Sequence, residues 1–180
     1  MIESLLGQLI ISTLQAGLSA RSISATIKRG QQPTQQGAVS GAAYYLWHID
    51  TVPVGWPEVQ DVWNASTSII DHTESQRQES RYQFSILAPV DLTNANAMLA
   101  IDYARIAATI FQSRATIDVL SSQGVGVQFI TQIRQSYFSD DFNRYEGNPT
   151  FDVKFSHADS ITIPGNKIDK FTNNFNSVST

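Results

Sequence analysis

Cysteine is absent from the sequence, and charged residues are scarce. The lack of cysteine excludes disulfide bonds, thiolate metal sites and a cysteine nucleophile. Charged residues make up 16% of the 180 residues, and 16 acidic residues against 12 basic ones give a formal charge of −4. Because there is also no block of basic residues, the composition argues against a protein that grips nucleic-acid phosphates.

Long apolar runs are also missing. No run reaches the roughly 18 residues that a membrane-spanning helix needs, and the N-terminus has no basic region of the signal-peptide type. We therefore expect a soluble protein with no membrane partner. Its length predicts a single domain, which we place at residues 1–164, followed by a polar tail at 165–180.

The apolar spacing predicts two helices. In residues 2–18 the apolar side chains recur every three or four positions, and the same is true of residues 94–113. The second helix is apolar on two flanks, which is more than one sheet face covers. One flank carries Leu99, Tyr103, Ile106 and Ile110. A contact with another subunit and a central position in the core are both consistent with this pattern.

Strands are predicted on either side of the second helix. Residues 44–52 are aromatic and β-branched, and Pro53, Gly55 and Pro57 are expected to end that strand. Residues 81–89 alternate between apolar and polar side chains, as do residues 149–163, while 125–138 predict one kinked strand or two. Residues 72–80 are polar and predict a loop. This order of elements predicts an α+β fold, a mostly antiparallel sheet with the long helix on one face, plus an N-terminal helix and an extended arm.

The extended arm is the uncharged segment 30–43. Four glutamines, three glycines and one proline give it no periodicity. It is either a flexible linker or a segment that becomes ordered against a neighbouring molecule.

Catalytic signatures are hard to find. His157 and Asp159 share one face of a predicted strand and would form two ligands of a metal site, but no third ligand is evident. A metal-dependent hydrolase would have to combine them with Asp152 and Asp141. Phosphate-binding glycine loops and the G-x-S-x-G motif are absent. We therefore predict no enzyme activity, no cofactor, no catalytic residue and no metal site.

Aromatic residues cluster near the first strand, which leaves a binding module as an alternative function. Tyr44, Trp47, Trp56 and Trp63 would form a stacking platform for a carbohydrate, although packing in a core or between subunits explains them as well.

Several segments together resemble the phage tail terminator and neck proteins. These are Gln31-Gln32-Pro33-Thr34-Gln35-Gln36 leading to Tyr44-Tyr45-Leu46, then Arg81-Tyr82-Gln83-Phe84-Ser85-Ile86 before the long helix, then Asp141-Phe142-Asn143-Arg144, and Phe151-Asp152-Val153-Lys154-Phe155. The resemblance covers residues 1–163.

The resemblance implies a structural virion protein, assembled in the host cytoplasm and located in the tail or neck. Such a protein forms a homohexameric ring that ends polymerisation of the tail tube, contacts the tube protein and a neck or head-completion protein, and lets DNA pass without specific binding. The expected interface residues are of three kinds. They are the arm residues Gln31, Gln32, Pro33, Gln35 and Gln36, the hairpin-tip residues Glu74, Arg77 and Glu79, and the helix residues Leu99, Tyr103, Ile106 and Ile110.

Overall fold

A computed structural model describes residues 3–30, 41–67, 69–89, 96–139 and 145–165. Its elements, in chain order, are α1 (Glu3–Ser19), β1 (Thr26–Arg29), β2 (Ala43–Asn64), β3 (Ile69–Leu87), α2 (Ala100–Gln112), α3 (Arg114–Ser122), β4 (Gly126–Ile130), β5 (Arg134–Ser139) and β6 (Tyr145–Pro164). None of the described helices is long and apolar enough to span a membrane.

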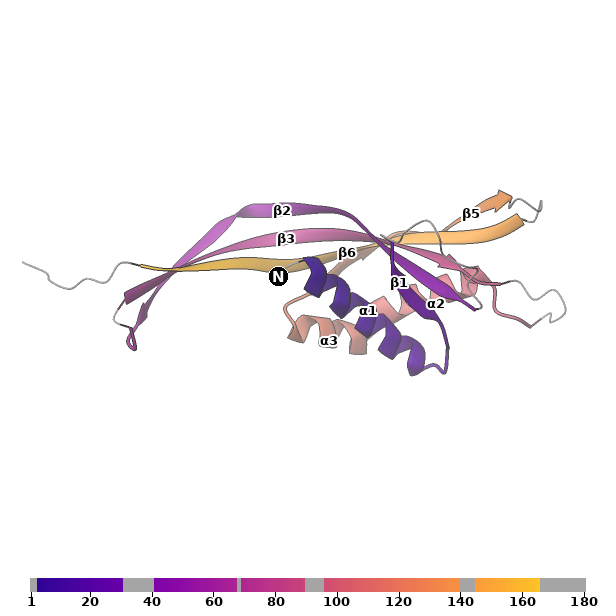
Figure 1. Cartoon of the computed structure of the whole chain (residues 1–180), viewed down its shortest axis with the longest axis horizontal. Helices are drawn as coiled ribbons and strands as arrows, with labels where there is room; N and C mark the ends of the chain where they lie inside the picture. The colour runs from indigo at the N-terminus through magenta and orange to yellow at the C-terminus, as the bar shows by residue number, and fades with distance from the viewer. Residues whose placement is uncertain (1–2, 31–40, 68, 90–95, 140–144, 166–180) are drawn as a thin grey trace, which may run out of the picture.

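The strands form one sheet in the order β1-β2-β3-β6-β4, and β5 also pairs with β6. The pairing of β1 with β2 is parallel, whereas the other pairings are antiparallel. All three helices lie on one face of the sheet and cover only part of its length (Figure 1). The predicted α+β fold, with a mostly antiparallel sheet and the main helix on one face, is confirmed.

The core lies between the helices and the covered part of the sheet. From α1, Leu6, Ile10, Leu14 and Leu18 are fully buried at intervals of four residues. Phe84 of β3 stacks on Phe151 of β6, with ring centroids 5.0 Å apart, and its ring lies 5.2 Å from that of Phe111 in α2. The spacing that predicted the helices and the alternation that predicted the strands therefore converge on one aromatic and aliphatic core.

The predicted long helix is shorter at its start and is broken near its end. It begins at Ala100 rather than at residue 94. At this start, the Asp102 carboxylate accepts a hydrogen bond from the backbone N–H of Leu99. It ends at Gln112, and Ser113 caps the following helix by accepting from the backbone N–H of Thr116. Both apolar flanks of α2 find partners in the same subunit, namely α1 on one side and the sheet on the other.

The largest departure from the predictions is the length of the first hairpin. The predicted loop at 72–80 is strand, and β2 continues through Pro53, Gly55 and Pro57 to Asn64. Strand β3 is central, so β2 and β6 satisfy its backbone on both sides. The polar side chains from His72 to Glu79 are partly or fully exposed, whereas Ser80 is buried. The prolines are tolerated because this part of β2 is a sheet edge, with a bulge between Val54 and Glu58 where Gly55 has a positive φ of 74°.

The strand predictions for residues 125–138 and 149–163 are confirmed. The segment predicted as one kinked strand or two is β4 and β5, and the long alternating segment is β6, which runs without a break through Ala158. The Gln-rich part of the predicted arm, residues 31–40, lies outside the described residues.

Candidate assembly interface

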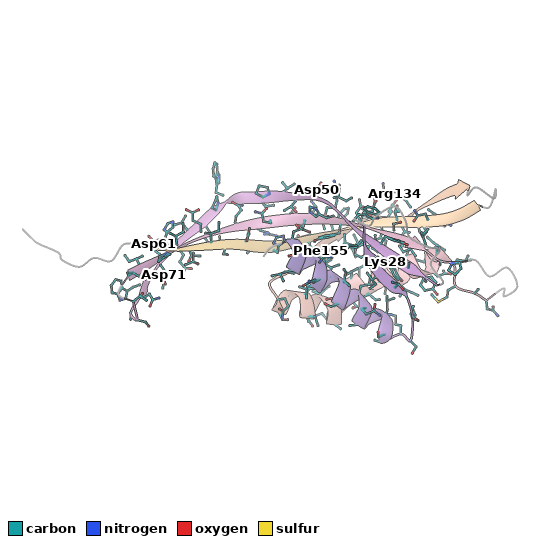
Figure 2. The ribbon with its side chains drawn as sticks, viewed as in Figure 1. Lys28, Asp50, Asp61, Asp71, Arg134 and Phe155 are labelled. Carbon is teal, nitrogen blue, oxygen red and sulfur yellow. The ribbon has the colours of Figure 1, made fainter. Side chains whose placement is uncertain are left out.

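Beyond the helices, the sheet narrows to three strands. We call this part the distal ribbon: residues 51–64 of β2, 69–80 of β3 and 157–164 of β6. Asp61 and Asp71 lie near its far end, whereas Phe155 lies in the helix-covered half of the sheet (Figure 2). The ribbon carries six carboxylates against one arginine, a formal charge of −5 within a chain of −4. The rest of the chain is therefore close to neutral, and the negative charge is concentrated in the ribbon.

The ribbon exposes a row of large apolar side chains, which we call the ribbon stripe: Val59, Trp63, Ile70, Ile161 and Ile163. The register places Trp63 opposite Ile70, and both Val59 and Ile161 opposite Glu74. Alternation along the strands puts this row on the face that carries the core under the helices. Ile161 is 64% exposed and Trp63 57%. The side chains of Asp61, His72 and Glu74 lie between these apolar residues on the same face. Exposed apolar groups bordered by polar ones are typical of an interaction site.

An imidazole lies between two carboxylates beside the ribbon stripe. The Nδ1 atom of His72 is 2.6 Å from Oδ1 of Asp61, and its Nε2 atom is 3.3 Å from Oε1 of Glu74. The hydrogen bond with Asp61 first, and that with Glu74 second, raise the pKa of His72 above its ordinary 6.5. Because the carboxylates bind opposite edges of the ring, they do not converge on one metal ion, and no such cluster occurs elsewhere among the described residues.

The raised pKa of His72 predicts a pH-dependent contribution to stability. The protonated imidazole stabilises the folded chain below about pH 6.5, and this contribution is lost as the pH rises through the higher folded-state pKa. In Asp61→Asn we expect the pKa of His72 to fall toward its ordinary value, as measured by NMR titration of the imidazole. Asp71→Asn is the control because Asp71 binds Asn64 rather than His72. An equal fall in both variants would contradict the assignment.

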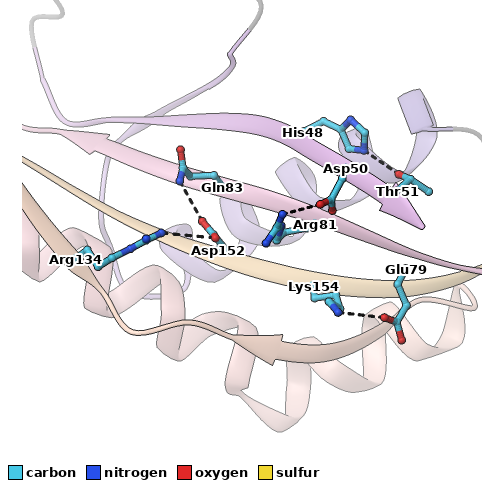
Figure 3. Close-up of polar contacts among 9 residues, drawn as sticks. All are labelled: His48, Asp50, Thr51, Glu79, Arg81, Gln83, Arg134, Asp152 and Lys154. Carbon is cyan, nitrogen blue, oxygen red and sulfur yellow. Dashed lines mark hydrogen bonds and ion pairs between the residues drawn. The ribbon is translucent and has the colours of Figure 1, made fainter. Parts of the chain in front are cut away.

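The opposite face of the sheet presents charges that neutralise one another (Figure 3). Arg81 binds Asp50 at 2.6 Å, Lys154 binds Glu79 at 3.2 Å, and Arg134 lies 3.6 Å from Asp152. The Asp152 carboxylate also accepts a hydrogen bond from Gln83. Because these three cations are paired with carboxylates, they interact less strongly with the phosphate groups of a nucleic acid.

A chain of polar side chains joins the strands at the root of the ribbon. The Thr51 hydroxyl oxygen lies 2.8 Å from Nε2 of His48 and 2.8 Å from the Ser80 hydroxyl oxygen. The Ser80 hydroxyl oxygen also lies 3.1 Å from Nε2 of His157. Burial lowers the pKa of His157, which favours its neutral form. Although Ser80 and His157 have the contact of a nucleophile and its base, Ser80 is fully buried and no substrate reaches it. The chain of contacts is therefore structural.

The residues proposed for the alternative functions do not gather into one site. His157 and Asp152 point to opposite faces of β6, and Asp141 lies outside the described residues. Tyr44 is fully buried, Trp56 is 94% exposed on the β2 bulge, and Trp63 belongs to the ribbon stripe. Neither a shared metal site nor a single aromatic platform results.

The predicted interface residues are distributed over three places. Residues 31–36 lie outside the described residues. Glu74, Arg77 and Glu79 lie within β3 and not at a hairpin tip, because the turn lies beyond Asn64. On the helix, Leu99 is half exposed and Tyr103 and Ile106 are partly buried, whereas Ile110 is fully buried and packs against Gly17 of α1.

Sequence reasoning missed the ribbon stripe as a surface. The alternation of Ile161 and Ile163 with polar neighbours did signal a strand with one apolar face. The exposure of that face depends on where the helices end, which the alternation does not specify.

The fold combines a one-sided helical layer with a mostly antiparallel sheet that extends into the distal ribbon (Figure 1). The chain is similar to the sheath/tube terminator of the PVC extracellular contractile injection system in its extended state, with a TM-score of 0.56 and 12% identity. The alignment covers 100% of this chain and 64% of that chain, and at this identity it establishes the fold alone.

The family model described as E217 gateway protein gp29 matches residues 5–165. The chain therefore belongs to the E217 gateway protein gp29 family. No curated protein sequence matches the chain. The resemblance to tail terminator and neck proteins is confirmed.

Proposed function

We propose that the protein forms a homohexameric ring at the head-proximal end of a phage tail, where it ends polymerisation of the tail tube and joins the tail to the neck. It acts without catalysis, as a component of the virion. Its partners are other copies of itself, the tail tube protein and a neck or head-completion protein. Membership of the gateway family and the terminator fold support this role.

The observation that carries the proposal is the ribbon stripe. Five large apolar side chains on the projecting ribbon are 39–64% exposed, and none of the helices that the structure describes covers them (Figure 1). Covering them with a neighbouring subunit removes apolar surface from water, at roughly 25 cal/mol per Å². Contact between a ribbon and a neighbour's nearly neutral body also avoids the repulsion between two ribbons of charge −5. This is a head-to-tail contact, the kind that closes into a ring.

Passage of DNA through the ring agrees with the charges described above. The chain is net acidic, and the cations Arg81, Lys154 and Arg134 on the uncovered sheet face are paired with carboxylates. A surface of this kind makes few phosphate contacts, so it does not retain DNA.

The native mass in solution tests the ring. Light scattering over a range of concentrations is expected to give about 119 kDa, which is six copies of the 19.9 kDa chain. If the purified chain stays at one copy, negative-stain images of the protein mixed with tail tubes decide whether the ring forms on the tube. A single copy in solution together with bare tube ends would contradict the proposal.

A further inference from the structure

The distal ribbon has two long edges, and they differ in how they are protected. The edge formed by β2 carries Pro53 and Pro57, with a bulge between Val54 and Glu58. Proline, bulges and irregular backbone are the usual means by which proteins prevent an edge strand from pairing with another chain. The edge formed by β6 has none of these from His157 to Ile163, and its register with β3 is regular throughout.

Among the described strands, none pairs with the outer side of this part of β6. Strand β4 pairs with residues 153–156 of β6, and β5 pairs with residues 145–150. Residues 158–164 are all exposed. Around Ser160 and Thr162, therefore, no strand of the described part of the chain covers the outer side of β6.

The backbone direction identifies the groups on this edge. Asp152 uses both its N–H and its C=O toward Thr131, on the β4 side. Because alternate residues of a strand point to the same side, Ser160 and Thr162 direct their N–H and C=O groups to that side too. The hydroxyl group of Ser160 contacts that of Ser75, and the hydroxyl group of Thr162 contacts that of Thr73. These contacts hold β6 against β3. The edge is thus an ordered template.

We propose that this edge of β6, around Ser160 and Thr162, accepts an extended strand from a protein of different sequence. The strand is basic and alternates apolar with polar side chains. Main-chain hydrogen bonds would supply the affinity, and side chains on alternate positions would supply the specificity, as in other cases of strand addition. This goes beyond the proposed ring, which uses the face of the ribbon and not its edge.

Side chains along the edge define the strand that fits. Ile161 and Ile163 lie on the stripe side, so apolar groups of the added strand would extend the ribbon stripe. Ser160 and Thr162 lie on the other side and favour small polar groups. The charge of −5 on the ribbon favours lysine or arginine in the added strand and opposes an acidic one.

A groove of about 430 Å³ lies where β4 begins, and it reaches across the sheet to Ser75 and Arg77 of β3. Its lining includes Gly124, Gly126 and the β6 residues Ser156 and His157. Gly124 has no heavy atom within 4 Å of the position where a Cβ would lie, so the groove has room beside the backbone.

A second copy of this chain is a less favourable source of the added strand than a protein of different sequence. Pairing two ribbons brings together two charges of −5, and the matching β2 edge is interrupted by its prolines. The edge at β1 offers only four residues, Thr26–Arg29. These features favour a different protein, and the test below separates the two donors.

The test uses the full-length protein and a synthetic probe, an eight-residue peptide with valine at every second position and lysine or threonine between. Hydrogen exchange measured by mass spectrometry should show slower exchange of the amides in 157–164, by about tenfold, when the peptide is present. The same peptide methylated on alternate backbone nitrogens lacks the edge donors and should give no slowing. A version with glutamate in place of lysine should also give none.

Two variants examine the edge itself. Thr162→Pro removes one outward N–H and should weaken peptide binding about tenfold, whereas Thr162→Val keeps that N–H and should bind as the wild type does. Both lose the Thr73–Thr162 hydroxyl contact, so the comparison isolates the backbone. Native mass is recorded for each, because failure of the ring and failure of strand addition are then distinguishable.

Three outcomes would overturn the proposal. The first is equal slowing by the methylated peptide, and the second is equal slowing by the glutamate peptide. The third is slowing at 157–164 that appears without peptide as the protein concentration rises, since a second copy would then be the donor. The methylated peptide leaves the protein unaltered, so the test does not depend on folding of Thr162→Pro.

Discussion

The double variant Ile161→Asp/Ile163→Asp is expected to fold normally and to fail to assemble. The two side chains are 64% and 56% exposed in the single subunit, so their replacement removes little buried area on folding. We expect the free energy of unfolding to change by no more than about 1 kcal/mol. At the centre of an interface, each apolar residue of this size contributes on the order of 2 kcal/mol, and an unpaired carboxylate there is costly. Association should weaken at least about 100-fold.

Light scattering and chemical denaturation of the same preparations measure the two effects. The matched control is Ser160→Asp/Thr162→Asp, which adds the same charge to the same strand but on the opposite face. It should still assemble if the ribbon stripe is the interface. Loss of assembly in both variants would show that added charge alone is responsible, and retention in both would exclude the stripe.

Phe84→Ala is expected to have the largest effect on folding. The Phe84 ring is fully buried, stacks on Phe151 at 5.0 Å and contacts Phe111 from the helix layer. Its removal leaves a cavity between the sheet and α2, with an expected loss of about 3–5 kcal/mol. Since single domains are stable by about 5–15 kcal/mol, this loss is a large fraction of the total. Urea denaturation followed by circular dichroism measures it.

The same chemical change at an exposed site supplies the control. Phe129 lies on the other face of the sheet and is 56% exposed. Phe129→Ala should lower the free energy of unfolding by less than about 1 kcal/mol. Similar losses in the two variants would mean that the aromatic cluster around Phe84 is not the centre of the core.

The parts of the fold that were predictable are those where one face is buried. The four-residue spacing from Leu6 to Leu18 and the alternation from Tyr82 to Ile86 both follow from contact with a single core. Residues 72–80 gave no such signal because all of them are polar and, apart from the buried Ser80, none lies in the core. Their strand conformation depends on hydrogen bonds to β2 and β6, which are distant in the sequence.

The candidate site could be predicted only in outline. The broad apolar surface of the second helix was consistent with a neighbouring subunit and with a central position in the core. Its own subunit buries Ile110 against Gly17 and leaves Leu99 half exposed. The family was recognisable from its strands and helices. The ribbon stripe was not, because whether Trp63 or Ile161 is exposed depends on the end of the helix layer and on no local pattern.

The long hydrogen-bonded ladders of the distal ribbon have a mechanical consequence. Strand β2 has 22 residues and β6 has 20, so each spans roughly 65–75 Å when extended. A force applied along the strands loads the hydrogen bonds between them in shear, so that many bonds must break together. A force that pulls the hairpin apart from its turn breaks them one after another. The ribbon is therefore stiff along its length and weak to peeling, so it transmits tension along the strands better than it resists separation at its tip.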